Sequence, residues 1–104
     1  YVDDIALGTV AALAPLGFEI VNLGNDQPVS LQTVISSIEN LLGRRARIEY
    51  RPAHPADVSA TWAAISKARQ LLGWEPKVGL EAGLQKSVEW YLENRQWVIK
   101  IRLQ

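Results

Sequence analysis

The segment from residue 31 to residue 42 carries the pattern that most constrains the fold of this chain. Its apolar residues recur three and four positions apart, at Leu31, Val34, Ile35, Ile38, Leu41 and Leu42. That spacing places them on one side of an α-helix. Ser30 is a favourable N-terminal cap because its hydroxyl can accept a hydrogen bond from a free backbone N–H. Gly43 is a ready C-terminal stop. We therefore predict a helix over residues 31–42 with defined ends.

Three further helices are predicted. The first begins near Asp3 and Asp4, whose carboxylates suit a helix N-terminus, and runs to about Leu13. Its apolar side is formed by Ile5, Val10 and Leu13. A short helix covers residues 66–72 and ends at Gly73, since the residue before a proline disfavours the helical region. The last helix runs from residue 80 to about Arg95, and its apolar stripe consists of Leu80, Leu84, Val88, Tyr91 and Leu92.

Two segments are typical of β-strands. Residues 18–23 are rich in strand-forming side chains and stop at a turn signal over residues 24–26. Residues 46–50 alternate apolar and charged side chains, and the loop of residues 51–60 contains two prolines. The tail of residues 97–104 also alternates. It is compatible with a strand, a frayed end of the last helix or an edge that docks elsewhere.

Composition indicates an ordinary globular protein. The chain has 104 residues, of which 48% are hydrophobic and 21% are charged. That length favours a single domain over residues 1–104, which would bury only roughly 60–70% of its unfolded surface. Eleven basic residues balance eleven acidic ones, so neither nucleic acid nor an anionic membrane is expected as a partner.

Several classes of site are excluded by residue counts. The chain has no cysteine and one histidine, His54, so we expect no metal site and no disulfide. No apolar stretch approaches the roughly 20 residues that cross a bilayer, and the N-terminus is not typical of a signal peptide. Cytoplasmic residence is the default expectation. Because the chain begins at Tyr1 and contains no methionine, we expect a fragment or a chain without its first residues.

Short phrases follow one another in a fixed order along the chain. They are Tyr1-Val2-Asp3-Asp4-Ile5, Val21-Asn22-Leu23-Gly24, Pro28-Val29-Ser30-Leu31, Pro55-Ala56-Asp57-Val58, Ser66-Lys67-Ala68, Leu71-Leu72-Gly73-Trp74-Glu75-Pro76, Leu80-Glu81-Ala82-Gly83-Leu84 and Val88-Glu89-Trp90-Tyr91. As an ordered set they resemble the C-terminal third of the extended short-chain dehydrogenase/reductase family, the NAD-dependent epimerases and dehydratases. The UDP-glucuronate and UDP-glucose 4-epimerases are the members they resemble most.

The resemblance implies an α/β fold. The chain would contain the last helix–strand unit of a Rossmann sheet and most of a small α+β substrate lobe, without the dinucleotide-binding half. In an intact relative, NAD transiently oxidises C4 of the sugar, the ketone rotates, and hydride returns to the other face. The lobe grips the nucleotide and sets the orientation of the sugar.

The parts of the family that carry catalysis are missing from this sequence. None of the three tyrosines has a lysine four positions later, and no G-x-x-G-x-x-G turn is present. We therefore expect no catalytic and no cofactor-binding residue, with NAD implied only for an intact parent. The isolated chain is expected to be inactive.

Two residues match the substrate-binding pattern of the relatives. The resemblance places Asp57 as an acceptor for a ribose hydroxyl, and His54 where relatives have an arginine or glutamine that reaches the diphosphate. A carboxylate suits a sugar diol and a donor suits phosphate. A loop-capping aspartate and a solvated histidine are the alternatives. Ala56 replaces a glycine of the relatives, and Ala64 replaces an aspartate that caps the next helix.

Three other features have a structural and a functional interpretation. Asp3 and Asp4 could form an acid–base or metal-binding pair, but adjacent carboxylates at a helix start are usually caps. The arginines at 44, 45 and 47 could bind phosphate or could simply be solvated. The four tryptophans favour core or interface packing over base stacking, because the chain carries no net charge.

Two functions from different classes follow. The chain is either the nucleotide-sugar-binding portion of an NAD-dependent epimerase or dehydratase, or a stand-alone, non-catalytic binding or oligomerising module from a truncated gene. Its partners would be a UDP-sugar or the missing Rossmann domain. Because the strand of residues 18–23 would lack its neighbours, a bare edge predicts a homo-oligomer if the chain is stable alone.

Overall fold

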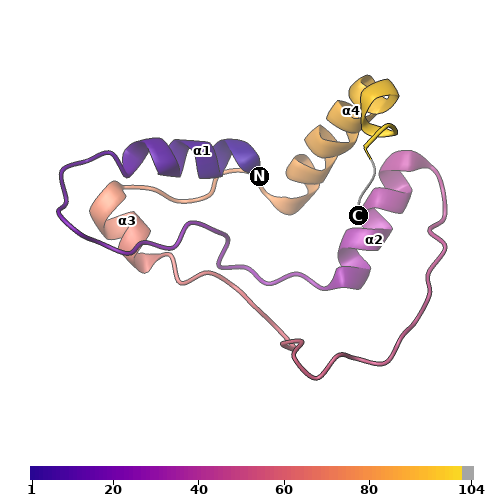
Figure 1. Ribbon diagram of the computed structural model, residues 1–104, viewed down its shortest axis with the longest axis horizontal. Helices are drawn as coiled ribbons and strands as arrows, with labels where there is room; N and C mark the ends of the chain where they lie inside the picture. The colour runs from indigo at the N-terminus through magenta and orange to yellow at the C-terminus, as the bar shows by residue number, and fades with distance from the viewer. Residues whose placement is uncertain (102–104) are drawn as a thin grey trace. The chain divides into compact units, whose positions relative to one another are not determined.

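The computed structural model describes residues 1–101, and the chain forms two compact units (Figure 1). Unit 1 comprises residues 1–29 and 49–79 and contains α1 (Val2–Ala11) and α3 (Ser66–Leu72). Unit 2 comprises residues 30–48 and the chain from Leu80 onward, and contains α2 (Leu31–Leu42) and α4 (Leu80–Val98). The expectation of a single domain over residues 1–104 stays a prediction.

In unit 2, α2 packs against α4, and the predicted ends of α2 are confirmed. The Ser30 hydroxyl accepts a hydrogen bond from the Thr33 N–H at 3.0 Å. Gly43 closes the helix in the left-handed conformation, with φ of 62°. Only glycine adopts this conformation without strain, so the glycine at position 43 determines where the helix ends.

The last helix is longer than expected. It continues past Arg95 to Val98, and the Ile101 N–H then donates to the Val98 carbonyl at 3.0 Å. Trp90 and Trp97 lie edge to face, with ring centroids 6.1 Å apart. Of the three interpretations of the tail, residues 97–101 therefore favour a continuation of the helix; residues 102–104 lie outside the described part.

Glu39, in the last turn of α2, forms hydrogen bonds to the segment that follows the helix. Its Oε1 accepts from the Ala46 N–H at 2.7 Å, and its Oε2 accepts from Arg45 Nη1 at 3.0 Å. The hydrogen bond from Ala46 is the main cause that holds the pKa of Glu39 below its ordinary value of 4.5, while burial opposes the shift and Arg45 adds to it.

The pH dependence of unit 2 follows from this shift. Because the pKa of Glu39 is lower in the folded state, its stabilisation is present above pH 4.5 and is lost as the pH falls through the folded pKa. We expect Glu39→Gln to lower the melting temperature at pH 7, and the difference from the wild type should shrink as the pH is lowered below 4.5. Thermal unfolding followed by circular dichroism checks this. Glu49→Gln, which alters an exposed pair with Arg51, is the control. A difference that persists at low pH would contradict the assignment.

Neither predicted strand forms as such within residues 1–101. Residues 18–23 and 46–50 lie in irregular segments between the helices. A strand needs a neighbour to accept and donate its backbone hydrogen bonds, and strand propensity alone cannot supply one. These two assignments are therefore corrected for the described residues.

The packed side of α1 also differs from the prediction. Val10 and Leu13, expected to face a core, are 64% and 84% exposed. The buried residues of α1 are instead Asp4 and Gly8, which are four positions apart and therefore lie on one side of the helix. Val10 and Leu13 are therefore largely uncovered within unit 1.

None of the helices in residues 1–101 combines the length and the apolar character that a membrane span needs.

Candidate functional site

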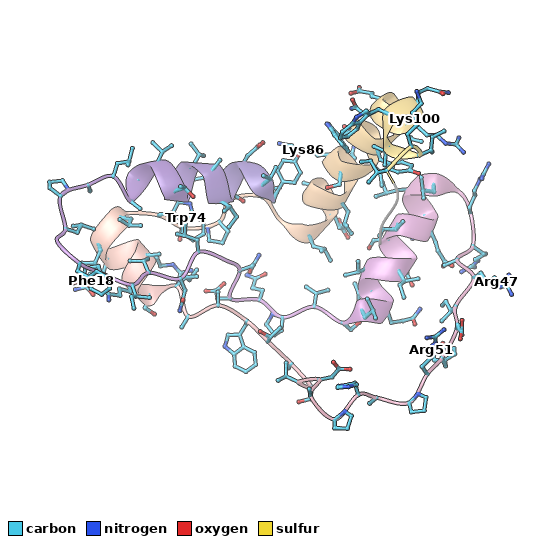
Figure 2. The ribbon with its side chains drawn as sticks, in the orientation of Figure 1. Phe18, Arg47, Arg51, Trp74, Lys86 and Lys100 are labelled. Atoms are coloured by element: carbon cyan, nitrogen blue, oxygen red, sulfur yellow. The ribbon has the colours of Figure 1, made fainter. Side chains whose placement is uncertain are left out.

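The core of unit 1 supports the candidate site. It consists of Ile65, Ala68 and Trp74, which are 2%, 0% and 6% exposed. Partly buried side chains surround these three, including Leu23 and Ala63. Figure 2 shows the Trp74 side chain beside α1, where the indole Nε1–H donates to the Asp4 carbonyl at 2.8 Å. Trp74 thus contacts three parts of unit 1: Asp4 of α1, Ala68 of α3 and Leu23.

Asp4 is an anchor rather than the cap expected from the sequence. The N-terminal cap of α1 is Tyr1, and no side chain caps that end. The buried Asp4 carboxylate instead accepts from the Val78 N–H at 2.9 Å, which ties the chain after Trp74 to α1. Among residues 1–101 no three carboxylates or histidines gather as potential metal ligands.

An open groove of about 650 Å³ lies on unit 1 between residues 21–25 and residues 61–64. The two walls meet where the Ala63 N–H donates to the Asn25 carbonyl at 2.9 Å. Asn22 and Thr61 supply polar side chains, and Trp62, 62% exposed, supplies an aromatic surface. The groove can therefore accept a ligand that has both hydrogen-bonding groups and flat apolar surface.

Two glycines allow the walls and the core to approach closely. A Cβ at Gly24 would lie 2.7 Å from the Ala63 Cβ, well inside van der Waals contact. A Cβ at Gly8 would lie 2.9 Å from the Leu23 methyl groups and from the Trp74 Nε1. Packing therefore requires glycine at position 24, where the facing atom is a Cβ, whereas at Gly8 the facing atoms are the ends of side chains.

His54 and Asp57 lie together in one tight turn of unit 1. The Asp57 N–H donates to the His54 carbonyl at 2.9 Å, and the Asp57 Oδ2 accepts from the His54 N–H at 3.3 Å. Both residues are exposed and neither lines the groove. Residues 58–60 connect this turn to the groove wall at Thr61. The structure thus gives Asp57 a turn-capping role, and its role toward a ligand stays a prediction.

The hydrogen bonds of the turn indicate which ring nitrogen of His54 can donate to a ligand. His54 Nδ1 accepts from the Ala56 N–H at 3.2 Å, so a neutral ring carries its proton at Nε2. Nε2 is then the atom that can donate to an anionic ligand. No residue other than glycine has a positive φ within residues 1–101, so Ala56 carries none of the strain that a left-handed backbone would impose.

The arginines after α2 fit the solvated interpretation. Arg45 is 92% exposed and pairs with Glu39, and Arg51, farther along, pairs with Glu49 at 2.9 Å. Figure 2 shows the Arg47 and Arg51 side chains on the irregular segment that follows α2.

The groove itself was not predicted from the sequence. The sequence favours a structural turn at Asn22 and Gly24, although the family phrase that they match turns toward the site, and it favours packing for Trp62. The Asn-Leu-Gly phrase and the segment of residues 61–64 lie far apart along the chain, and spacing alone cannot indicate that they face each other. The small residues at positions 24 and 63 are the one sequence feature consistent with a close approach of these two segments.

Comparisons with known proteins bear on this arrangement. No family model matches the chain. The UDP-glucuronate 4-epimerase of Thermodesulfobacterium geofontis is 48% identical in an alignment that covers 99% of this chain and 32% of that protein. An uncharacterised protein of Methanocaldococcus jannaschii is 38% identical over 97% of this chain and 31% of its own length. The chain therefore spans about a third of the length of these relatives.

A solved structure gives the same result. The crystal structure of the Bacillus cereus UDP-glucuronic acid 4-epimerase in complex with UDP-glucuronic acid and NAD matches with a TM-score of 0.79 and 34% identity. The match covers 89% of this chain and 31% of that one. The chain belongs to the NAD-dependent epimerase/dehydratase family of extended short-chain dehydrogenase/reductases. Its relatives there are UDP-glucuronate 4-epimerases and related UDP-glucose epimerases, and it corresponds to their C-terminal part.

Proposed function

We propose that this chain is the nucleotide-sugar-binding region of an NAD-dependent 4-epimerase and acts together with a dinucleotide-binding domain. The observation that carries the proposal is the match to the Bacillus cereus enzyme, which holds UDP-glucuronic acid and NAD. UDP-glucuronic acid is accordingly the substrate that we propose for the whole protein. The His54–Asp57 turn is connected by residues 58–60 to one wall of the groove, residues 61–64, which supports a common role.

The proposed roles follow from the available atoms. Asp57 Oδ2 is engaged by the His54 N–H, so Oδ1 keeps its full capacity to accept from the ribose hydroxyls. His54 Nε2–H would donate toward the diphosphate. Asn22 and Trp62 would bind the part of the ligand that enters the groove, through an amide hydrogen bond and through contact with the flat indole ring.

The chemical step requires groups that this sequence does not contain. NAD, when bound by a partner domain, would supply the transient oxidation at C4 of the sugar. The chain has no tyrosine followed four residues later by lysine, so its own residues would bind and orient the sugar nucleotide rather than move the proton.

Exposed apolar side chains of unit 1 support the proposal that this unit binds a partner domain. Phe18, labelled in Figure 2, is 90% exposed, and Leu13 and Ile20 are 84% and 71% exposed. Several large apolar side chains this exposed in one unit are consistent with a surface that is covered in an assembled protein. A dinucleotide-binding domain is the partner that the family relationship favours.

A second candidate is a self-associating module without catalysis, and the same exposed residues favour it. Such a module would bury Phe18 and Ile20 against another copy of the chain. Sedimentation equilibrium separates the two candidates. A dimer that binds no nucleotide sugar would favour the module.

Titration with UDP-glucuronic acid tests the proposed function. We expect amide chemical shifts to move in residues 54–57, 22–25 and 61–64, with little change in α4. Asp57→Asn should weaken binding by about tenfold to a hundredfold, because a hydrogen bond to a charged group is lost. Glu93→Gln, an exposed change on α4, is the matched control. Shifts confined to α4, or binding unaffected by Asp57→Asn, would contradict these assignments.

A further inference from the structure

Helix α3 is joined to both walls of the groove. Residues 61–64 run directly into Ile65, the buried N-terminal cap of α3. On the other wall, Asn25 Oδ1 accepts from the Gln27 N–H at 2.8 Å and stiffens the turn at Asp26. Arg69 of α3 reaches this turn, and its Nη2 donates to Asp26 Oδ2 at 3.1 Å.

The Arg69 guanidinium is held from two sides. Its Nε donates to Glu75 Oε2 at 3.3 Å, beyond the end of α3. Glu75 belongs to neither wall, so this second contact orients the arginine, while the first contact holds Asp26, the residue that follows the wall of residues 21–25. Ala68, the residue before Arg69, is fully buried, which gives the helix a fixed base in the core.

We propose that Arg69 is a positioning residue that fixes the separation of the two groove walls through Asp26. One wall is attached to α3 by the chain itself. The other packs on the core through Val21 and Leu23, and this ion pair ties its end to α3 as well. Arg69 does not line the groove, so its effect on a ligand would be transmitted by the walls. The consequence for nucleotide-sugar binding rests on the proposed function, whereas the effect on the walls does not.

Hydrogen exchange of the Ala63 amide measures the wall separation without a ligand, because this N–H donates to the Asn25 carbonyl across the groove. An exposed ion pair contributes little to stability, so we expect Arg69→Gln and Asp26→Asn each to speed this exchange about two- to fivefold. The double variant should exceed neither single variant, because both remove one interaction. Glu75→Gln, which leaves the contact with Asp26 in place, should speed the exchange less than either of these variants.

The Trp74 amide, which donates to the Ala68 carbonyl at 3.2 Å, is the internal reference for the core. Its exchange should stay at the wild-type rate in all variants. Unchanged exchange at Ala63, or equal acceleration at Ala63 and Trp74, would overturn the proposal. In parallel, Arg69→Gln should weaken UDP-glucuronic acid binding by a similar factor. If the wild-type chain does not bind this ligand while the Ala63 amide accelerates as expected, the proposed function fails and the positioning role stands.

Discussion

Replacing Trp74 by alanine is expected to abolish the cooperative unfolding of unit 1. The side chain is 6% exposed and its indole donates to the Asp4 carbonyl. Removing a buried tryptophan costs about 3–5 kcal/mol. A domain of this size is stabilised by only about 5–15 kcal/mol, and unit 1 has a small core. Denaturant unfolding followed by circular dichroism and by the shifts of α3 amides measures the loss.

Two further variants separate the causes. Trp74→Phe keeps an aromatic ring and removes the indole N–H, so it should cost about 1 kcal/mol for the lost hydrogen bond in addition to the change in packing. Trp62→Ala removes a tryptophan that is 62% exposed and should leave the stability nearly unchanged. A Trp74→Ala protein as stable as the Trp62→Ala protein would contradict the assigned core.

Replacing Gly24 by alanine is expected to force the groove walls apart. The new Cβ would lie 2.7 Å from the Ala63 Cβ, which is fixed to the backbone and cannot rotate away. Overpacking of this kind costs about 1–3 kcal/mol. The hydrogen bond from Ala63 to Asn25 should weaken or break, and UDP-glucuronic acid binding should fall with it. Thermal unfolding and hydrogen exchange at Ala63 measure the two effects.

Gly79→Ala is the matched control for Gly24→Ala. A Cβ at Gly79 meets no atom within 4 Å, so the same chemical change should be nearly neutral there. If Gly24→Ala leaves both the melting temperature and the Ala63 exchange rate at the Gly79→Ala values, the close approach of the two walls is wrong.

The helices whose ends are encoded locally could be predicted from the sequence. The extent of α2 follows from its apolar spacing, the Ser30 cap and the Gly43 stop, all of which act within a few residues. The short helix of residues 66–72 ends at Gly73 as predicted, and that glycine also adopts a positive φ. Membership of the epimerase family, inferred from the ordered phrases, is confirmed by the relatives.

The remaining features depend on contacts between distant residues. Residues 18–23 have the composition of a strand, but strand formation requires a partner that residues 1–101 do not provide. The packed side of α1 is set by Gly8 and Asp4, which meet Trp74, rather than by its apolar residues. Asp57 and His54 were identified by resemblance, yet the hydrogen bonds that orient them were not visible in the sequence.

The central claim is tested most directly by the epimerase activity of a chimera. In this protein, the present chain replaces the matching region of the UDP-glucuronate 4-epimerase of Thermodesulfobacterium geofontis, to which it is 48% identical. With NAD bound, the chimera is expected to convert UDP-glucuronic acid to its C4 epimer, and Asp57→Asn in the same chimera should raise KM. A folded chimera that binds NAD but neither binds nor epimerises UDP-glucuronic acid would contradict the account.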